Sequence, residues 1–172
     1  MTWVPRFADW DIGDRLIRPA CAAVASHLPT PRIFSGRTGA YLSRWSILDA
    51  GPLGRISLHH FNRSDEDQEL HTHPRRWAIA LQLAGGYVEE RRVGNDVRRI
   101  RRAPGSLVFL RADTAHRVDL LDAANGSWSL ILTGPVVASW GFSDRRTWRF
   151  TPWRDFIRSK GLDPLEPRRS GR

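Results

Sequence analysis

His71 and His73 are separated by one residue in a segment with the character of a strand, and imidazoles at this spacing can bind a metal. Because successive side chains of a strand point to opposite faces, both imidazoles leave the backbone on the same side. A third imidazole, His116, follows the apolar run 107–110. Neutral imidazole nitrogens bind iron, nickel, copper, manganese and zinc, so we expect His71, His73 and His116 to be metal ligands.

Three protein ligands leave coordination positions of a metal open. A structural zinc site is closed by a fourth ligand, which is usually a thiolate. The single cysteine, Cys21, falls in a predicted helix away from the histidines, where a small core residue is expected. The three histidines therefore indicate a metal with open positions that can bind a substrate, although imidazole ligands alone do not identify the metal.

The elements that must position the histidines are short strands. Gly, Pro and Asn separate runs of strand character at 41–48, 55–61, 77–84, 87–93, 97–102, 107–110, 116–121 and 128–133. Gly85 and Gly86 end the run 77–84, and we expect them to close a hairpin that carries the histidine pair. The cluster 94–96 predicts a second hairpin. Short strands separated by turn residues in this way are typical of an antiparallel sandwich or barrel.

Helices are expected at both ends of the chain. The segment 11–27 predicts a short helix that Pro19 interrupts. One face of this helix should carry its apolar side chains, which are Ile12, Leu16, Ile17, Ala20, Val24 and Ala25. Near the other end, Thr151 and Pro152 should provide the N-cap and first position of a helix over 153–160, which Gly161 ends.

Length and composition suit one domain. We expect a helical segment at 1–35 that packs on a barrel at 36–150, followed by a helix and a mobile tail at 151–172. One cysteine excludes an internal disulfide and, with no signal-like segment, favours the cytoplasm. No apolar run is long enough to span a membrane.

The formal net charge of +9 comes almost wholly from arginine. Six arginines lie on the hairpin predicted at 87–102: Arg91, Arg92, Arg98, Arg99, Arg101 and Arg102. Neighbouring residues of a strand face opposite sides, so only half of these arginines could meet phosphates together, and no aromatic side chains are interleaved for base stacking. Nucleic acid is therefore not the expected partner.

The two histidine segments resemble the two motifs of the cupin superfamily. The first motif is a Gly, five residues, His-x-His, three or four residues, Glu, six residues and Gly; the second is a Gly, five residues, Pro-x-Gly-x-x-His, three residues and Asn. The residues on matching positions are His71, His73, Gly85, Gly105 and His116. The motif positions with a different residue are Asp65 and Ala78 for the first Gly and the Glu, and Arg111, Asp113 and Leu120 for the Pro, the second Gly and the Asn.

The resemblance covers roughly the middle half of the chain. It implies an all-β fold, the cupin double-stranded β-helix or jelly-roll barrel, with short N-terminal and C-terminal helices. A site of three histidines without the Glu is similar to that of thiol dioxygenases, which implies iron. Their Ser-His-Tyr relay has Trp140 at the matching place here, so cysteine is not the expected substrate. Cupins of this kind also form homodimers through sheet extension.

The register of a cupin places Ala78, Ala80 and Gln82 on the inner wall of the strand after the histidine pair. Two alanines would leave room beside a metal, and Gln82 could orient a substrate, although it could equally face the solvent. Arg44 could clamp a carboxylate or phosphate, or pair with an acid at the surface. His59 and His60 point to opposite faces, and the sequence leaves open which one enters a pocket.

The acidic loop before the histidine pair could supply a missing carboxylate ligand or merely face the solvent. Its acidic residues are Asp65, Glu66, Asp67 and Glu69. Within the motif segment, no residue is assigned a catalytic role by the sequence alone.

Taken together, these features predict a metal-dependent cupin enzyme. Iron(II) is the first choice, with manganese, nickel and zinc as alternatives, and the function expected is that of a dioxygenase or other oxidoreductase. A small polar substrate would chelate the metal at the three-histidine centre. Three alternatives stay open: a sugar or sugar-nucleotide isomerase or epimerase that uses a histidine as base, a non-catalytic binding module for a small ligand, and a chance motif match.

Overall fold

The computed structural model describes residues 7–36 and 39–161, so the tail predicted at 162–172 lies outside the described residues. The helices are α1 (Phe7–Ser26) and α2 (Trp153–Ser159). The strands are β1 (Arg32–Gly36), β2 (Gly39–Asp49), β3 (Arg55–Phe61), β4 (Leu70–His71), β5 (Trp77–Ala84), β6 (Tyr87–Val93), β7 (Asp96–Arg102), β8 (Leu107–Arg111), β9 (His116–Leu120), β10 (Ser127–Thr133), β11 (Gly141–Ser143) and β12 (Phe150–Pro152).

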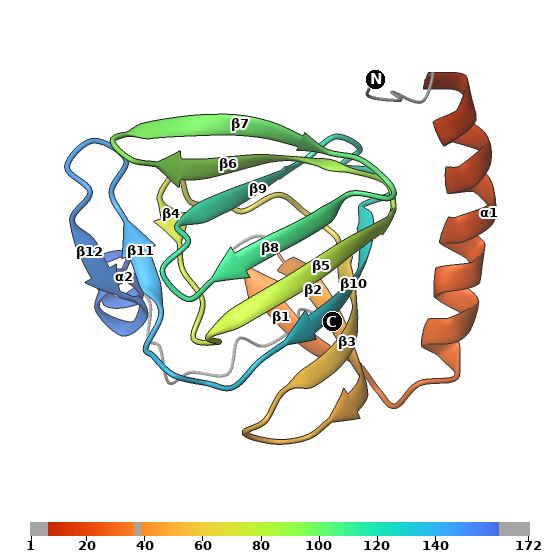
Figure 1. The fold of residues 1–172 in the computed structure, drawn as a ribbon, viewed down its shortest axis with the longest axis horizontal. Helices are drawn as coiled ribbons and strands as arrows, with labels where there is room; N and C mark the ends of the chain where they lie inside the picture. Colours follow the sequence, from red (N-terminus) through yellow and green to blue (C-terminus); the bar gives the residue numbers. More distant parts are fainter. Residues whose placement is uncertain (1–6, 37–38, 162–172) are drawn as a thin grey trace.

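Two six-stranded antiparallel sheets make up the barrel, and α1 lies beside it (Figure 1). The strand order is β1-β2-β3-β10-β5-β8 in the first sheet and β12-β11-β4-β9-β6-β7 in the second. Strands that are neighbours in one sheet come from distant parts of the sequence, which is the winding of a jelly roll. The predicted all-β class and jelly-roll barrel are therefore confirmed.

The histidine pair does not lie in the predicted hairpin. β4 lies between β11 and β9 in the second sheet, whereas β5 lies between β10 and β8 in the first. Gly85 and Gly86 carry the chain on to β6, which pairs with β9 and β7. Gly85 has a φ of +70°, and a Cβ there would lie 2.5 Å from the Gly126 carbonyl oxygen, so the crossing between the sheets requires glycine. The second predicted hairpin, formed by β6 and β7, is present.

Helix α1 differs from its prediction in two ways. It continues through Pro19 as one helix. Its apolar contact with the barrel is made by Cys21 and Ala25, and Arg18 adds hydrogen bonds to the Asn125 and Gly126 carbonyls, whereas Leu16 and Val24 are 68% and 52% exposed. Small side chains allow the helix to approach the bulky residues on the outer face of the first sheet, which explains why its larger apolar residues point elsewhere.

The core under α1 contains Cys21, Ala25, Leu58, Ala84 and Trp128. The Trp128 ring stacks between Trp45, at 5.5 Å between centroids, and His60, at 4.3 Å. A second cluster lies where β5 meets β8 and contains Ala78, Ala80, Val108 and Leu110.

Helix α2 covers the end of the second sheet. Phe156 is buried and its ring stacks on Phe142 of β11, with centroids 3.9 Å apart. The predicted N-cap was wrong by one residue, because Thr151 belongs to β12 and Pro152 takes the cap position without a side-chain bond. Gly161 follows the helix with a φ of +74°, as expected for a residue that ends a helix.

Within the described part of the chain, neither helix combines the length and the apolar character that crossing a lipid bilayer would need.

Candidate metal centre

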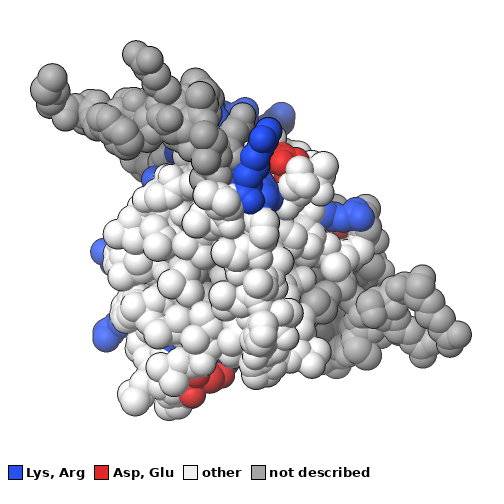
Figure 2. All heavy atoms as spheres, turned by 90° about the vertical axis from the view of Figure 1, so that its right-hand side faces the viewer, with Lys and Arg blue, Asp and Glu red and all other residues white. Residues whose placement is uncertain are grey.

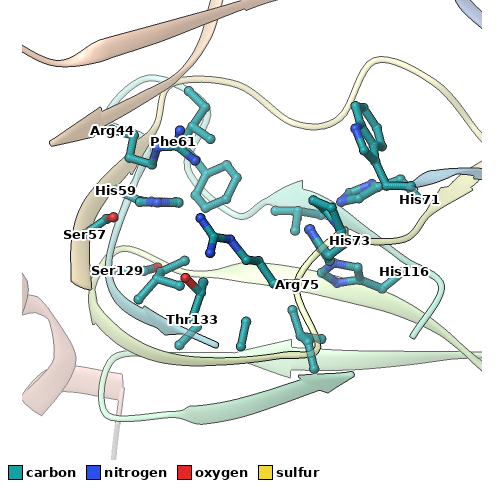
Figure 3. A pocket seen from close by; sticks show the side chains of 18 of the residues that line it. Arg44, Ser57, His59, Phe61, His71, His73, Arg75, His116, Ser129 and Thr133 are labelled. Carbon is teal, nitrogen blue, oxygen red and sulfur yellow. The ribbon is translucent and has the colours of Figure 1, made fainter. Parts of the chain in front are cut away.

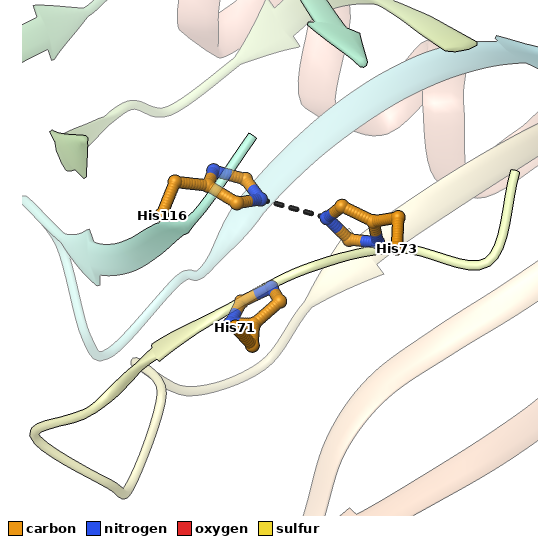
Figure 4. Close-up of side chains that lie close together, drawn as sticks. All are labelled: His71, His73 and His116. Atoms are coloured by element: carbon orange, nitrogen blue, oxygen red, sulfur yellow. Dashed lines mark hydrogen bonds between the residues drawn. The ribbon is translucent and has the colours of Figure 1, made fainter. Parts of the chain in front are cut away.

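The structure brings His71, His73 and His116 together at one end of the barrel interior (Figure 4). His71 ends β4 and is the register partner of His116, which begins β9. His73 follows two residues later, beyond the strand. The centroids of the three rings lie 4.7 to 5.0 Å apart. Residues distant in sequence therefore form one cluster because β4 and β9 are neighbours in the second sheet.

The ligand atoms of the cluster converge. One nitrogen from each ring lies within 4.8 Å of the other two, and the Nε2 atoms of His73 and His116 are 2.7 Å apart. Two ring nitrogens at this distance can share either a proton or a cation. Three ligands of 2.0–2.1 Å bond length around one metal would lie roughly 3–4 Å from each other, which is close to the observed arrangement.

Carboxylates lie behind two of the three rings. Asp65 Oδ2 is 3.4 Å from Nδ1 of His71, and Glu89 Oε1 is 3.2 Å from Nδ1 of His116. Metal-binding histidines commonly donate their other ring N–H to a carboxylate, which fixes the tautomer and the ring orientation. The two carboxylates thus leave Nε2 of His71 and His116 as the nitrogens available to a metal.

Glu89 has no exposed surface and is held by charged partners. Nε of Arg91 and Nε of Arg102 each donate to its carboxylate over 2.8 Å. Burial alone would raise the pKa of Glu89, but the hydrogen bonds from His116, Arg102 and Arg91 outweigh burial and lower the pKa to about 2. Glu89 is therefore ionised at neutral pH and can accept a hydrogen bond from the Nδ1–H of His116.

Asp65 occupies a position that the sequence suggested for a missing carboxylate ligand. The structure places it behind His71, where Oδ2 also accepts a 2.7 Å hydrogen bond from the Val118 N–H. Burial raises the pKa of Asp65 to about 6. Its position is that of a residue that orients the ring of His71.

The histidines are in the protonation state that metals require. Burial lowers the pKa of His71 to about 4 and that of His73 well below the ordinary value. The pKa of His116 is also lowered by burial. All three imidazoles are therefore neutral at pH 7, and a neutral imidazole offers its lone pair to a metal. The three imidazole ligands, the convergence of their nitrogens and the carboxylates behind two of the rings all fit a divalent metal.

A cavity of about 350 Å³ lies next to the three rings. Ala78 and Ala80 of β5 are on its wall, as the cupin register predicted. Figure 3 shows the histidines on one side of the pocket, Arg44, His59, Ser57 and Ser129 on the other, and Arg75 between them. The volume is near the lower end of the range for ligand pockets, about 300–1,000 Å³, so the pocket suits a small molecule.

Gln82, a predicted substrate-binding residue, does not line the cavity. It is 1% exposed, and Nε2 donates to the Ala84 carbonyl, to Ser127 Oγ and to the Trp128 carbonyl. Its Oε1 accepts from Ser129 Oγ over 2.8 Å. These bonds use the donors and the acceptor of the amide to join β5 to β10, which is a structural role.

Arg44 and His59, the other two predicted substrate-binding residues, are register partners on β2 and β3, and both line the cavity. The structure also decides between His59 and His60, because His60 lies on the opposite face, where it stacks on Trp128. Burial lowers the pKa of His59 to about 3, so its ring is neutral at physiological pH.

Several residues of the site were missed from the sequence. Arg55, Arg75 and Glu89 belong to the cavity or to the support of its histidines. Arg75 carried a signal, because it follows His73 by two residues. Glu89 carried none, because its contact with His116 depends on the pairing of β6 with β9. Trp140, at the place of the thiol dioxygenase relay, lines the cavity and stacks on Trp153 with centroids 5.7 Å apart.

No protein-family profile matches the sequence, and a search of curated proteins gives no significant match. Solved structures do share its fold. A structure from a study of the DMSP lyases RdDddP and RnDddQII aligns with a TM-score of 0.55 and 17% identity, over 76% of this chain and 70% of that chain. Fe(II)-HppE with the alternative substrate (S)-1-HPP aligns with a TM-score of 0.50 and 12% identity, over 63% and 56%. FeII HppE in complex with substrate aligns with a TM-score of 0.51 and 9% identity, over 63% and 57%.

The chain thus spans just over half the length of the HppE chains. Identities this low establish the fold and not the activity. The two jelly-roll sheets and the structural neighbours agree with the fold that the motif resemblance implied: this chain has a double-stranded β-helix, or jelly-roll, fold.

Proposed function

We propose that the protein is a metal-dependent enzyme, an iron(II) dioxygenase or related oxidoreductase, that acts on a small polar substrate in the cavity beside His71, His73 and His116. The observation that carries the proposal is the convergence of three neutral imidazoles, two of them backed by carboxylates, on the edge of a pocket. Three ligands from one side would leave the side toward the cavity for a substrate.

The residues of the chain have separable roles in this proposal. His71, His73 and His116 would hold the metal, and Asp65 and Glu89 would orient two of the rings. A redox-active divalent metal bound there supplies a Lewis acid and a site of electron transfer to dioxygen. Ala78 and Ala80 keep space open for the substrate, and Trp140 forms part of the wall that restricts water.

Iron(II) is the first choice because HppE, which shares the fold, was solved with Fe(II). Imidazole ligands also suit manganese, nickel and zinc, so the metal has to be identified by measurement. This chain spans just over half the length of the HppE chains, so the activity of HppE serves only as a precedent.

An isomerase or epimerase is the second candidate, and His59 is the residue that it would use. This ring lines the cavity and its buried Nδ1 has no hydrogen-bond partner among the described residues. A general base is most effective with a pKa near the working pH, whereas the pKa of His59 is lowered to about 3. The weakness of this base makes us place the metal-dependent reaction first.

Oxygen consumption separates the two candidates. Protein purified without chelators is loaded anaerobically with iron(II), manganese(II), nickel(II) or zinc(II), and oxygen uptake is followed with a panel of small hydroxy, amino and thiol acids. We expect uptake with a redox-active metal that stops after chelation. Turnover of a substrate in metal-free protein without oxygen would instead support the isomerase and overturn the oxidoreductase.

A further inference from the structure

The charged side chains that line the cavity are all arginines. Among the described residues, they are Arg44, Arg55 and Arg75, and no Asp or Glu lines the cavity. Arg55 is paired with Asp49 outside the cavity, but the guanidinium groups together still make the potential in the cavity positive, since walls of low dielectric constant focus the field. An anion in the cavity would compensate this charge.

Arg75 enters the pocket beside the histidines and points away from them, toward His59 (Figure 3). Figure 3 shows its guanidinium between His73 and His59, in the middle of the pocket. Within the described ranges, its hydrogen bond is from Nη1 to the Gly134 carbonyl oxygen, over 3.1 Å, and no carboxylate pairs with it. A guanidinium has five N–H donors in a planar fork that matches the oxygens of a carboxylate or phosphate. Arg75 therefore retains donors and charge for a ligand.

Arg44 and Arg55 extend this positive region along β2 and β3. Arg55 donates from Nε to Asp49 over 2.9 Å, and Asp49 is exposed outside the cavity. Burial lowers the pKa of Arg44 to about 10, and the nearby charges of Arg55, Arg32 and Arg75 add to the decrease. Cations that repel one another in a partly buried place are stabilised when an anion binds between them.

His59 is an independent sign of a ligand at the same place. Its Nδ1 is buried and has no hydrogen-bond partner in the described part of the protein. Buried polar atoms are usually paired, so such an atom on a cavity wall indicates a partner that the chain does not provide. A neutral imidazole can donate one hydrogen bond to an anionic oxygen.

We propose that the arginine end of the cavity, formed by Arg44, Arg55, Arg75 and His59, binds the anionic group of the substrate. The substrate class is a small organic acid whose carboxylate or phosphate-type oxygens lie at the arginine end, with a second polar group a few bonds away that faces the histidines. The orientation toward the histidines depends on the proposed function, whereas the binding of the anion does not.

Calorimetric titration with glycolate and with inorganic phosphate tests the proposal, because these probes carry the two kinds of anionic oxygen. Ethylene glycol is the neutral counterpart of glycolate. We expect glycolate, phosphate or both to bind the wild-type protein and ethylene glycol not to bind, and the better of the two anions identifies the group. Equal binding of ethylene glycol and glycolate, or no binding of either anion, would overturn the proposal.

The variants Arg75→Gln and Arg44→Gln should weaken anion binding about 10- to 100-fold, the loss expected for hydrogen bonds between charged groups. Arg76→Gln is the matched control, since Arg76 is exposed and does not line the cavity, and it should bind like the wild type. Anion binding that is unchanged in Arg75→Gln and Arg44→Gln would contradict the assignment.

Metal content, measured by elemental analysis of the same samples, keeps the two proposals distinguishable. Arg75→Gln should keep the metal content of the wild type. His73→Ala should lose metal and still bind the anion. If no sample contains metal but the anions bind as predicted, the proposed function fails and the anion site stands; if metal is present but the anions do not bind, the reverse holds.

Discussion

Nδ1 of His116 lies 3.2 Å from Oε1 of Glu89, a carboxylate with no exposed surface that also receives hydrogen bonds from Arg91 and Arg102. The carboxylate of Glu89 therefore holds the ring of His116 in place through the ring nitrogen that faces away from the candidate metal centre. Three positively polarised partners keep this carboxylate ionised, and its contact with His116 leaves Nε2 directed at the other histidines. The first prediction concerns this support.

Glu89→Gln should weaken metal binding about 10- to 100-fold, because a carboxylate behind a metal-binding histidine orients the ring and raises its basicity. It should also lower the free energy of unfolding by about 3–5 kcal/mol, since Arg91 and Arg102 would lose a buried charge partner. Competition with a chelator measures the metal affinity, and urea unfolding measures the stability.

The control for this prediction is Glu90→Gln. Glu90 is also buried, and its carboxylate lies 3.0 Å from Arg145 and 3.4 Å from Arg117, whereas none of its ion pairs in the described part of the chain involves a histidine of the cluster. It should lose stability and keep the wild-type metal affinity. Equal metal affinities in the two variants would show that Glu89 has no part in orienting His116.

The second prediction concerns acid stability. The pKa of His59 is lowered to about 3 in the folded protein, so between pH 3 and 6.5 the unfolded chain binds a proton that the folded one does not. Stability from this group is thus lost as the pH falls below 6.5. Relative to His59→Gln, the wild-type protein should lose about 2 kcal/mol more between pH 6.5 and 4.5.

Urea unfolding at a series of pH values measures this difference. His27→Gln replaces an exposed histidine and should keep the wild-type slope. A slope for His59→Gln that parallels the wild type would mean that His59 is solvated and protonated in the folded protein.

The third prediction restores the carboxylate of the cupin motif. Ala78 holds the position of the motif Glu and lies on the cavity wall, so Ala78→Glu should add a ligand and tighten metal binding. Ala80→Glu places the same group two residues along the same face of β5 and is the matched control. Overpacking should cost both variants about 1–3 kcal/mol of stability. A metal affinity that rises equally in both would contradict the predicted register.

The fourth prediction concerns the attachment of α1. Trp128 is 7% exposed and packs against Cys21 and Ala25 of the helix, so Trp128→Ala should lower the free energy of unfolding by about 3–5 kcal/mol. Leu53→Ala, at a residue that is 78% exposed, should change it by less than about 0.5 kcal/mol. Thermal and urea unfolding provide the comparison. A similar small loss in both variants would mean that the helix contributes little to the fold.

Local pattern was enough to predict several strands. The bounds of β5 agree with the predicted run 77–84 because buried and partly exposed residues alternate along all of it. The short strands β11 and β12 were missed, since three residues carry no periodicity. The helix at 7–26 was predicted as interrupted because the sequence shows Pro19 but not the barrel face against which the helix is held.

The histidines of the candidate site could be found from the sequence, whereas its surroundings could not. The spacing of His71 and His73 is local, and the motif resemblance adds His116. The positions of Glu89 and Arg55 depend on which strands pair within each sheet, and residue spacing does not contain that information. Gln82 illustrates the same limit, because its place on β5 was predicted but its bonds to β10 were not.

The most direct test of the account is the metal content of the wild-type protein and of His73→Ala, purified without chelators and measured by elemental analysis. His60→Ala is the control, since His60 stacks on Trp128 on the other face of β3, and circular dichroism verifies that each variant is folded. We predict close to one divalent metal per chain in the wild type and in His60→Ala, and almost none in His73→Ala. A metal content that is the same in His73→Ala as in the wild type would contradict the three-histidine centre.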